Sequence, residues 1–370
     1  MPPRWPTRSV CPHPRTTDVS AVCQPPLNAA AIAAAAARLD AGELVAFATE
    51  TVYGLGADAR NPDAVRRIYA AKGRPADHPV IVHLAPGADV RQWAAHVPPV
   101  AQDLIDAFWP GPLTLILPRA AHIDATVSAG QDSIGLRCPS HPVAQALLTA
   151  FAQLHPGEPS GVAAPSANRF GQVSPSQAAH VIAEFPAEVA AGMPVLDGGP
   201  CDRGIESTIV DVSRVHLGVP PTLLRPGSIT AEQLAAVIGA EPARPDATAP
   251  RASGTLKAHY APHTPLELAD AARLAAMCAG EGLPARGQTV VLAYGDRPAH
   301  LPDAVVWHGL PDDPDRYAQA LYATLRDWDT RAMARLVVQA PPATSAWAAV
   351  NDRIHRAAAA FALDTDGLRH

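Results

Sequence analysis

The chain has 370 residues, of which 48% are hydrophobic and 17% charged, and its formal net charge at pH 7 is -6. This length fits two domains with sizeable cores. The acidic balance excludes a protein that binds nucleic acid through bulk positive charge, so any anionic ligand would need a local cluster of cations. The five cysteines are scattered without a Cys-x-x-Cys pair, which favours neither a disulfide framework nor a zinc site and is typical of the cytoplasm.

The first part of the chain predicts a disordered extension followed by an α/β domain. Residues 1–26 are rich in Pro and Arg and have no apolar core typical of a secretory signal, so we expect a disordered N-terminal extension. The alanine run that follows is too short for a bilayer span and predicts an ordinary helix, capped by Asn28 and ending near Gly42. Next come an apolar strand at 44–48, a helix at 62–71 that Asn61 caps, and a strand at 80–84.

Alternating elements continue to about residue 240. We expect helices at 98–109, 141–152 and 231–238, the last with a capping box formed by Thr230 and Gln233. Ser174-Pro175 predicts another helix up to residue 185, with Ser174 as its N-cap. Strands are expected at 113–117, 133–137, 161–164, 194–196, 207–212 and 222–224. The strands and helices are too irregular for a strict alternation, so residues 27–240 predict one α/β or α+β domain.

The remainder of the chain predicts a linker and a smaller domain. Residues 241–262 are rich in Pro and Ala and end in His259-Tyr260-Ala261-Pro262, as expected of a linker or lid. Residues 263–362 predict a second α/β domain, with strands at 289–293 and 304–307 and helices at 317–328, 330–334 and 346–361. Residues 363–370 form a short tail.

Lysine is almost absent, which draws attention to the stretch Lys72-Gly73-Arg74-Pro75. The only other lysine is Lys257. Because a lysine is a compact charge and an arginine a planar fork, the pair indicates two distinct contacts with a polyanion. The alternative is a solvated helix end, where cations are favoured by the helix dipole.

Polar side chains also gather at predicted strand ends, where open α/β sheets bind ligands. They are Thr51, His83, Ser133, Arg137, Ser166, Asn168, Ser207 and Arg225. For each hydroxyl alone, a turn is the favoured explanation. Arg137 differs because it lies in an apolar strand, where a charge needs an anionic ligand or an internal carboxylate.

One nucleotide-binding motif is weakly matched in this region, and another is missing. Gly54-x-Gly56-x-x-Ala59 follows a strand, as in a dinucleotide-binding fingerprint. The match is weak, because that motif opens directly into its helix, whereas here Asn61-Pro62 starts the helix later. No Gly-x-x-x-x-Gly-Lys loop is present. The sequence therefore indicates an unconventional nucleotide site.

Long motifs in order carry a resemblance to a known family. They are residues 49–56 (TETVYGLG), 72–75 (KGRP), 109–114 (WPGPLT), 165–168 (PSAN), 206–211 (ESTIVD) and 224–227 (LRPG). Over about residues 27–362 the chain resembles the L-threonylcarbamoyladenylate synthases, in the long form with a YrdC-like domain. The resemblance implies a twisted mixed sheet with helices, an extended linker and a smaller Rossmann-like C-terminal α/β domain.

The resemblance also implies an activity. Family enzymes join L-threonine, bicarbonate or CO2 and ATP into threonylcarbamoyl-AMP and pyrophosphate, for threonylcarbamoyladenosine modification of tRNA by downstream transferase proteins. It implies a nucleotidyltransferase in the cytoplasm, with Mg2+ on the ATP, no metal held by the protein, no membrane partner and at most a weak direct contact with tRNA.

The resemblance assigns site residues as well. It places L-threonine on Thr51, His83, Arg137, the backbone of Ala164 and Ser207, with Arg137 on the carboxylate. It places ATP on Arg74, His78, Ser133, Ser166, Asn168, Ser174, Arg225 and Tyr260. Lys72 and Arg74 would act in catalysis by neutralising charge, without a protein nucleophile.

The sequence departs from the usual family pattern at two places. The family often has Asn at the position of His78, which would make that ATP contact pH-sensitive, and residues 253–258 lack the usual Met and further basic residue.

One alternative function is that of a non-catalytic protein that binds tRNA or double-stranded RNA, against which the net acidity weighs. Another is carbamoyl transfer to a different acceptor, although the chain lacks the zinc-finger and acylphosphatase segments that usually accompany it.

Overall fold

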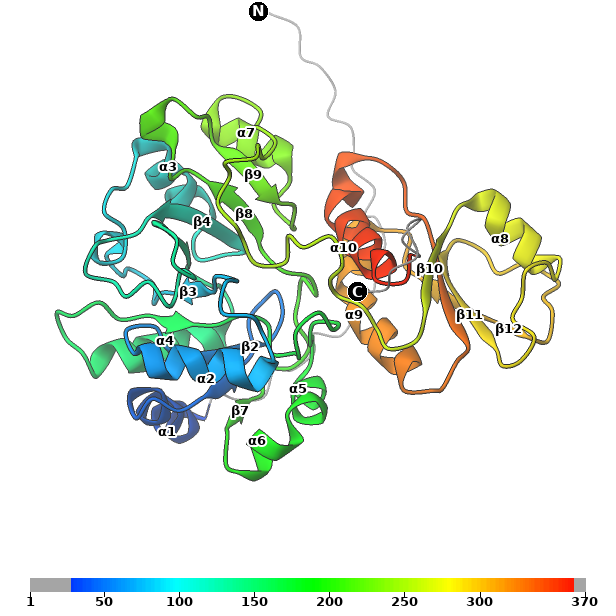
Figure 1. Cartoon of the computed structure of the whole chain (residues 1–370), viewed down its shortest axis with the longest axis horizontal. Coiled ribbons are helices and arrows are strands. Elements are labelled where there is room, and N and C mark those ends of the chain that lie inside the picture. The colour runs from blue at the N-terminus through cyan, green and yellow to red at the C-terminus, as the bar shows by residue number, and fades with distance from the viewer. Residues whose placement is uncertain (1–27, 363–370) are drawn as a thin grey trace, which may run out of the picture.

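A computed structural model describes residues 28–362, which form two units side by side (Figure 1). The expected disordered extension at 1–26 and the tail at 363–370 lie outside the described residues. The larger unit is built on a nine-stranded sheet and the smaller one on a four-stranded sheet. The predicted fold class, a mixed α/β sheet followed by a smaller α/β unit, is confirmed.

The larger sheet has the strand order β7-β1-β2-β6-β3-β5-β4-β8-β9. It is mixed, since β3 pairs with β5 and β4 with β8 in parallel, while β1–β2, β4–β5 and β8–β9 are antiparallel. The strands are β1 (Val45–Phe47), β2 (Gly54–Asp58), β3 (Ile81–His83), β4 (Leu113–Pro118), β5 (Ser133–Arg137), β6 (Val162–Ala163), β7 (Val195–Leu196), β8 (Thr208–Asp211) and β9 (Thr222–Arg225).

Helices surround this sheet at the positions that their capping residues predict. Asn28 and Asn61 accept backbone N–H bonds at the starts of α1 and α2, and Thr230 forms the predicted capping box with Gln233. The helices are α1 (Ala29–Asp40), α2 (Pro62–Lys72), α3 (Pro99–Phe108), α4 (Pro142–Gln153), α5 (Ala178–Glu184), α6 (Pro186–Ala190) and α7 (Ala231–Ile238). Two short 3-10 helices, η1 (Val90–Gln92) and η2 (Val215–Leu217), lie in connecting loops.

The predicted N-cap role of Ser174 is wrong. Helix α5 begins at Ala178 with Gln177 as its N-cap residue. The hydroxyl of Ser174 instead donates to Glu206 Oε1 at 2.5 Å. A carboxylate that is distant in sequence therefore takes the hydroxyl that local spacing assigned to a helix end.

Strand β2 was not predicted, because it runs through Gly54 and Gly56, and glycine is a poor strand former. A Cβ on Gly56 would lie 2.8 Å from ring or methyl carbons of both Phe47 and Val162. Glycine is thus required by close packing between neighbouring strands, a reason that no local pattern reveals.

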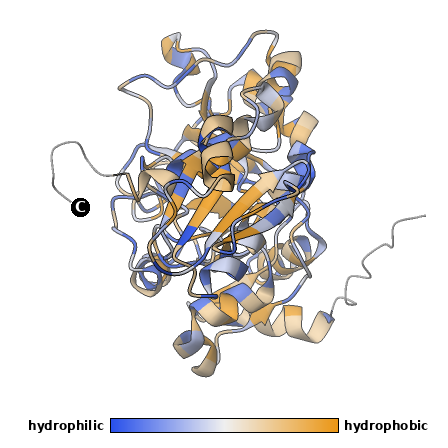
Figure 2. Ribbon diagram, turned by 90° about the vertical axis from the view of Figure 1, so that its right-hand side faces the viewer, coloured by the Kyte–Doolittle hydropathy of each residue, from blue (hydrophilic) through white to orange (hydrophobic). Residues whose placement is uncertain are grey.

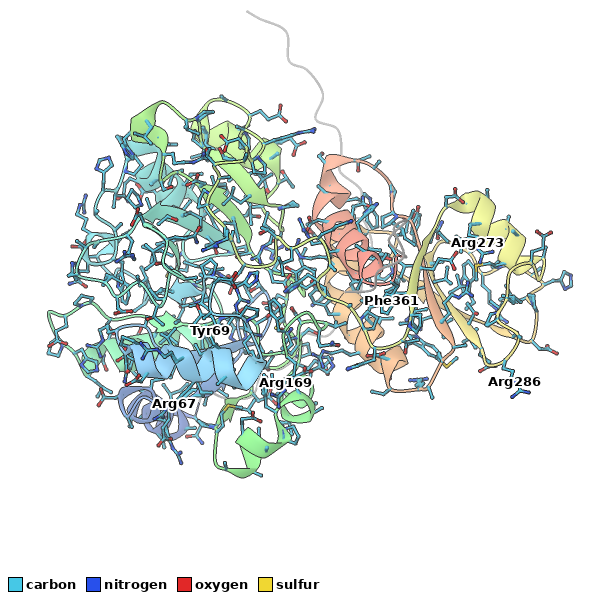
Figure 3. The ribbon with its side chains drawn as sticks, viewed as in Figure 1. Arg67, Tyr69, Arg169, Arg273, Arg286 and Phe361 are labelled. Atoms are coloured by element: carbon cyan, nitrogen blue, oxygen red, sulfur yellow. The ribbon has the colours of Figure 1, made fainter. Side chains whose placement is uncertain are left out.

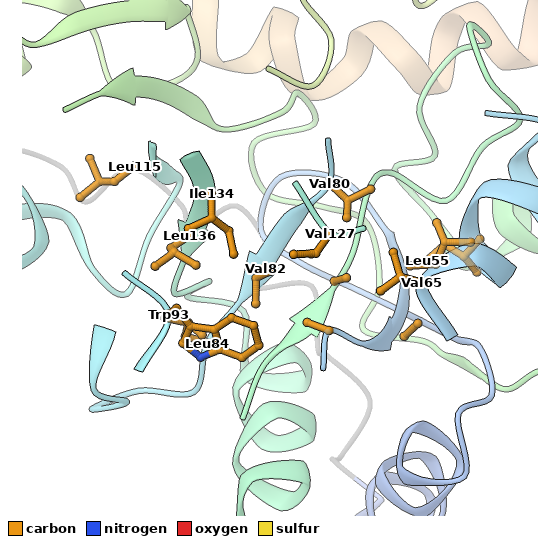
Figure 4. Packing of buried hydrophobic residues seen from close by; sticks show 14 of the residues in the cluster. Leu55, Val65, Val80, Val82, Leu84, Trp93, Leu115, Val127, Ile134 and Leu136 are labelled. Atoms are coloured by element: carbon orange, nitrogen blue, oxygen red, sulfur yellow. The ribbon is translucent and has the colours of Figure 1, made fainter. Parts of the chain in front are cut away.

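The main core lies between the larger sheet and its helices. Figure 4 shows Leu55 and Val65 together on one side and Ile134 and Leu136 together on the other, with Val82 between the two groups, all of them buried. The smaller unit, which faces the viewer in Figure 2, shows the same division, since its strands are mostly hydrophobic whereas the peripheral loops are largely hydrophilic. Burial of this apolar surface supplies the main driving force for folding of the unit.

The smaller unit has a parallel sheet of order β10-β13-β11-β12. Its elements are β10 (Leu266–Ala269), α8 (Ala271–Cys278), β11 (Thr289–Tyr294), β12 (Val305–Leu310), α9 (Pro314–Asp329), β13 (Arg335–Gln339), η3 (Ser345–Trp347) and α10 (Ala348–Ala359). Helices α9 and α10 lie toward the larger unit and α8 lies on the far side (Figure 1). Within residues 28–362, no helix is long and apolar enough to cross a membrane.

The predicted helix at 330–334 is wrong. Helix α9 ends at Asp329, the chain turns, with Ala332 at a φ of 50°, and β13 begins at Arg335. The element β13 lies in the middle of the sheet, where both faces are covered, so its apolar run Leu336–Val338 lacks the alternation of a half-exposed strand. Strand β10 and helix α8 were also not predicted.

Candidate active site

The best-defined cavity of the described residues opens where strand ends of the larger unit meet the linker. It is lined by Thr49, Thr51, Val52, Gly54, Arg74, Ile81, His83, Arg137, Ala164, Pro165, Ser166, Glu206, Ser207, Arg225, Ser253, Gly254, His259 and Tyr260. Strands β3, β5 and β9 deliver His83, Arg137 and Arg225 at their last residues. The sheet therefore brings two arginines and a histidine together that are far apart in sequence.

Arg137 is held by an internal carboxylate. Its Nη2 lies 2.7 Å from Glu50 Oε1, and both side chains are at most 5% exposed. Its Nη1 donates to Thr51 Oγ1 at 2.9 Å, and its Nε donates to the carbonyl of Gly111 at 3.3 Å. Burial alone would raise the pKa of Glu50, but the charge and hydrogen bond of Arg137 lower that pKa below its usual value. The charge required beside Arg137 is thus supplied by the protein.

His83 is a neutral, buried side chain beside this pair. Burial, followed by the positive charge of Arg137, lowers the pKa of His83 to about 3. Its Nδ1 is buried and has no hydrogen-bond partner among residues 28–362. A buried ring nitrogen without a partner is costly unless a ligand satisfies it.

Arg74 reaches the cavity from the turn after α2. Its Nη2 donates to the carbonyl of Pro79 at 2.8 Å and to Ser253 Oγ at 3.1 Å. Burial lowers its pKa to about 10, so it remains charged at neutral pH. Arg74 therefore joins the site to the linker while keeping a positive charge in the cavity wall.

Lys72, two residues before Arg74, points away from the cavity. Its Nζ donates to the carbonyl oxygens of Ser166, at 2.6 Å, and Asn168. The Asn168 amide in turn donates to the carbonyls of Arg169 and Gln172. The motifs 72–74 and 166–168 are thus in contact, through the Lys72 side chain and the backbone carbonyls of Ser166 and Asn168. Neither Lys72 nor Asn168 lines the cavity.

Ser207 and Arg225 form the opposite wall. Ser207 Oγ lies 2.8 Å from Thr114 Oγ1 and accepts from Arg225 Nη2 at 3.2 Å. Arg225 also donates to the carbonyls of Ser207 and Ser253. Burial is the main reason why the pKa of Arg225 is lowered. This wall, like that of Arg74, is tied to Ser253 of the linker.

The linker closes the cavity. Ala252 packs on a small apolar cluster formed by Ile81, Ile116, Ile209 and Leu224. Tyr260 is 1% exposed, and its φ of 62° lies in the left-handed region that is strained for a tyrosine. Its hydroxyl is directed at the carbonyl of Gly254, 3.5 Å away.

The predicted site residues divide into two groups. The cavity brings together Thr51, Arg74, His83, Arg137, Ala164, Ser166, Ser207, Arg225 and Tyr260. Outside its wall lie Lys72, His78, Ser133, Asn168 and Ser174. Of these, Ser133 lines a smaller neighbouring cavity that shares Ile81 and Ser253 with the main one, and His78 packs against the ring of Phe170 with centroids 5.2 Å apart.

Sequence reasoning assigned no role to Glu206, Ser253 or His259, which all line the cavity. Glu50 and Glu206 each directly precede a hydroxyl residue that was predicted for the site, Thr51 and Ser207 respectively. A buried carboxylate at such a position is a usable signal, because it requires a cation nearby. No comparable signal marks Ser253, whose role depends on where the linker lies.

The fold and cavity define a two-unit α/β protein with a closed, cationic site for an anionic ligand. The family model Sua5_yciO_yrdC, described as "Telomere recombination", matches residues 37–227. The model described as "Threonylcarbamoyl-AMP synthase, C-terminal domain" matches residues 229–359. The chain therefore belongs to the Sua5/YciO/YrdC family, in the two-domain form of the threonylcarbamoyl-AMP synthases.

Individual relatives agree. The threonylcarbamoyl-AMP synthase of Bacillus subtilis (strain 168) is 38% identical over 347 residues, covering 88% of this chain and 92% of that protein. That of Pyrococcus abyssi is 40% identical over 226 residues, covering 60% and 62%. The crystal structure of P. abyssi Sua5 complexed with L-threonine matches with a TM-score of 0.78 and 32% identity, over 90% of this chain and 95% of that one.

Proposed function

We propose that this chain is an L-threonylcarbamoyladenylate synthase, which forms threonylcarbamoyl-AMP and pyrophosphate from L-threonine, bicarbonate or CO2 and ATP. The observation that carries the proposal is one cavity in which Arg137, Arg74 and Arg225 converge from different strand and helix ends. Family membership and the likeness to a protein complexed with L-threonine support the choice of reaction.

The threonine subsite is assigned to the end of the cavity formed by Thr51, His83, Arg137, Ala164 and Ser207. Arg137 is fixed by Glu50 and Thr51, so its guanidinium meets the carboxylate without a costly reorientation. The unpartnered Nδ1 of His83 is available to a polar group of the amino acid.

The nucleotide is assigned to the adjoining part of the cavity, with Arg74, Ser166, Arg225 and Tyr260 in the wall. His78, Ser133, Asn168 and Ser174 lie outside that wall, so a direct role in ATP binding requires the linker to move. Lys72 is assigned a supporting role in catalysis, because its ammonium holds the carbonyls of Ser166 and Asn168.

The reaction needs no protein nucleophile. The threonine nitrogen bonds to the carbon of CO2 and loses a proton, which gives a carbamate. A carbamate oxygen then bonds to the α-phosphorus of ATP, the bond to the bridging oxygen breaks, and pyrophosphate leaves. Both reactants are anions, so the arginines act by positioning them and by neutralising charge. The closed linker excludes water, which would hydrolyse the product.

Mg2+ is treated as part of the nucleotide substrate. Among the described residues no cluster of three or more His, Cys, Asp or Glu side chains could hold a metal ion. The two carboxylates at the site, Glu50 and Glu206, are both engaged by arginines. Phosphate oxygens and water, which Mg2+ prefers, would therefore supply its ligands.

The proposal also places the enzyme in the cytoplasm, where it would hand its product to transferase proteins that modify tRNA. The test is an omission series. Pyrophosphate release should require ATP, L-threonine and bicarbonate together. Release that is independent of threonine would contradict the proposal.

A further inference from the structure

Glu206 lies where the larger unit, the smaller unit and the cavity meet. Its Oε1 accepts from Ser174 Oγ at 2.5 Å. Its Oε2 accepts from the Tyr322 hydroxyl at 3.0 Å and from Arg353 Nε at 2.7 Å. Tyr322 belongs to α9 and Arg353 to α10, so two helices of the smaller unit bind one carboxylate of the larger unit.

This contact is buried. Glu206 is 7% exposed, Arg353 1% and Tyr322 0%. Burial alone would raise the pKa of Glu206, but Arg353 and then Arg225 lower that pKa to about 2. An ionised carboxylate in such surroundings is stable only while its cation and hydrogen-bond donors stay in place.

The bound carboxylate connects to the site on two sides. Glu206 directly precedes Ser207, which lines the cavity and accepts from Arg225. Its other neighbour, Ser174, is fixed by the hydrogen bond to Oε1. Displacement of Glu206 would therefore disturb the cavity wall formed by Ser207 and Arg225.

The same two residues of the smaller unit also hold the lid. The ring of Tyr322 stacks on that of Tyr260 with centroids 5.8 Å apart, and the Arg353 guanidinium lies 5.3 Å from the centroid of the Tyr260 ring. Both contacts are within the usual range for aromatic and cation–π pairs.

We propose that Tyr322 and Arg353 are positioning residues, which hold Glu206 and Tyr260 in the geometry needed for catalysis although neither residue lines the cavity. This inference rests on the proposed function. It gives the C-terminal unit a definite role, which is to fix one wall and the lid of a site whose ligand-facing residues lie in the larger unit and the linker.

A matched pair of tyrosines provides the test. Tyr317 and Tyr322 both lie on α9 and are both fully buried, but the hydroxyl of Tyr317 has no partner within residues 28–362. Loss of one hydrogen bond to a charged group predicts that Tyr322→Phe raises the KM for ATP or lowers kcat by about tenfold or more. Tyr317→Phe should leave both constants at the wild-type values. Equal constants for the two variants would overturn the inference.

Arg353 provides a second, graded comparison. Arg353→Lys keeps the positive charge but loses the planar set of guanidinium N–H donors, whereas Arg353→Met leaves Glu206 without its cation. We expect kcat/KM to fall from wild type to Arg353→Lys to Arg353→Met, measured where circular dichroism shows each variant folded. If Arg353→Met does not fold, Tyr322→Phe and Arg353→Lys still decide the matter. A wild-type protein that releases no pyrophosphate would contradict the proposed function instead, so the two failures are distinguishable.

Discussion

Nη2 of Arg137 lies 2.7 Å from Oε1 of Glu50, and both side chains are almost completely buried. Arg137 comes from the end of β5, and Glu50 from the loop between β1 and β2. The pair explains how a cavity for anions can exist in the absence of a ligand. Its positive wall is balanced from within, and the carboxylate also fixes the direction of the guanidinium.

Removal of this internal charge should destabilise the protein. Glu50→Gln leaves Arg137 buried without an ionised partner, and breaking a buried pair from one side typically costs about 3 kcal/mol or more. Urea unfolding should show a loss of this size in the free energy of unfolding.

Glu43 is the control for this experiment. It pairs with Arg38, and both side chains are more than two-fifths exposed. Surface pairs contribute less than about 1 kcal/mol, so Glu43→Gln should have little effect. A similar, small loss in both variants would show that the Glu50–Arg137 pair does not stabilise the fold.

Arg137→Lys tests the assignment of the threonine subsite. A lysine keeps the charge, but it cannot contact Glu50, Thr51 and the Gly111 carbonyl from one planar group. We expect the KM for L-threonine to rise at least about tenfold, the size of one charge-assisted hydrogen bond, with a smaller change for ATP. An increase confined to the KM for ATP would reverse the assignment of the two subsites.

Lys72→Met tests the supporting role of the buried lysine. The substitution leaves the carbonyls of Ser166 and Asn168 without their donor, and each unsatisfied buried group costs about 1 to 3 kcal/mol. We expect loss of both stability and activity. Lys257, the only other lysine, is exposed, so Lys257→Met should resemble wild type in thermal unfolding. A fully stable but inactive Lys72→Met protein would instead favour direct contact with phosphate.

Stability should depend on pH through two buried histidines. Burial is the main cause that lowers the pKa of both His83 and His259 to about 3 in the folded protein, against an ordinary value of about 6.5. Between these values the unfolded chain binds more protons than the folded one. The free energy of unfolding should therefore fall as the pH falls from 6.5 toward 3, by about 1.4 kcal/mol per pH unit for each proton.

Chemical unfolding at several pH values would check this slope. His83→Gln should reduce the slope of the free energy of unfolding against pH by the contribution of one proton, whereas replacement of the exposed His300 should leave this slope unchanged. A stability that is independent of pH from 6.5 to 4 would show that these rings are not buried as neutral groups.

The sequence could predict elements whose ends are marked locally. Asn61-Pro62 and Gly73 bound α2, with Gly73 in the left-handed conformation at its C-cap, and the Thr230–Gln233 box starts α7. Strands β2 and β13 could not be predicted in this way. The first depends on the close approach of Phe47 and Val162 to a glycine, and the second is covered on both faces.

The same distinction applies to the site. Motif residues such as Thr51 and Arg137 could be named in advance, because a charge in an apolar strand is conspicuous. Their pairings could not, since Glu206 selects Ser174 and Arg353 across 32 and 147 residues of sequence. Figure 3 illustrates the difficulty with three other arginines. Arg169 lies close to the boundary between the units, whereas Arg273 and Arg286 lie within the smaller unit. Only the folded chain distinguishes arginines near the interface from those remote from it.

The most direct test of the account is to identify the product. The protein should be incubated with ATP, L-threonine and 13C-labelled bicarbonate, and the nucleotides analysed at once by mass spectrometry. The account predicts an AMP derivative that contains threonine and one labelled carbon, formed together with pyrophosphate and reduced about tenfold or more in the Arg137→Lys variant at low threonine. Conversion of ATP without any labelled threonine adduct, or no conversion by a folded protein, would contradict it.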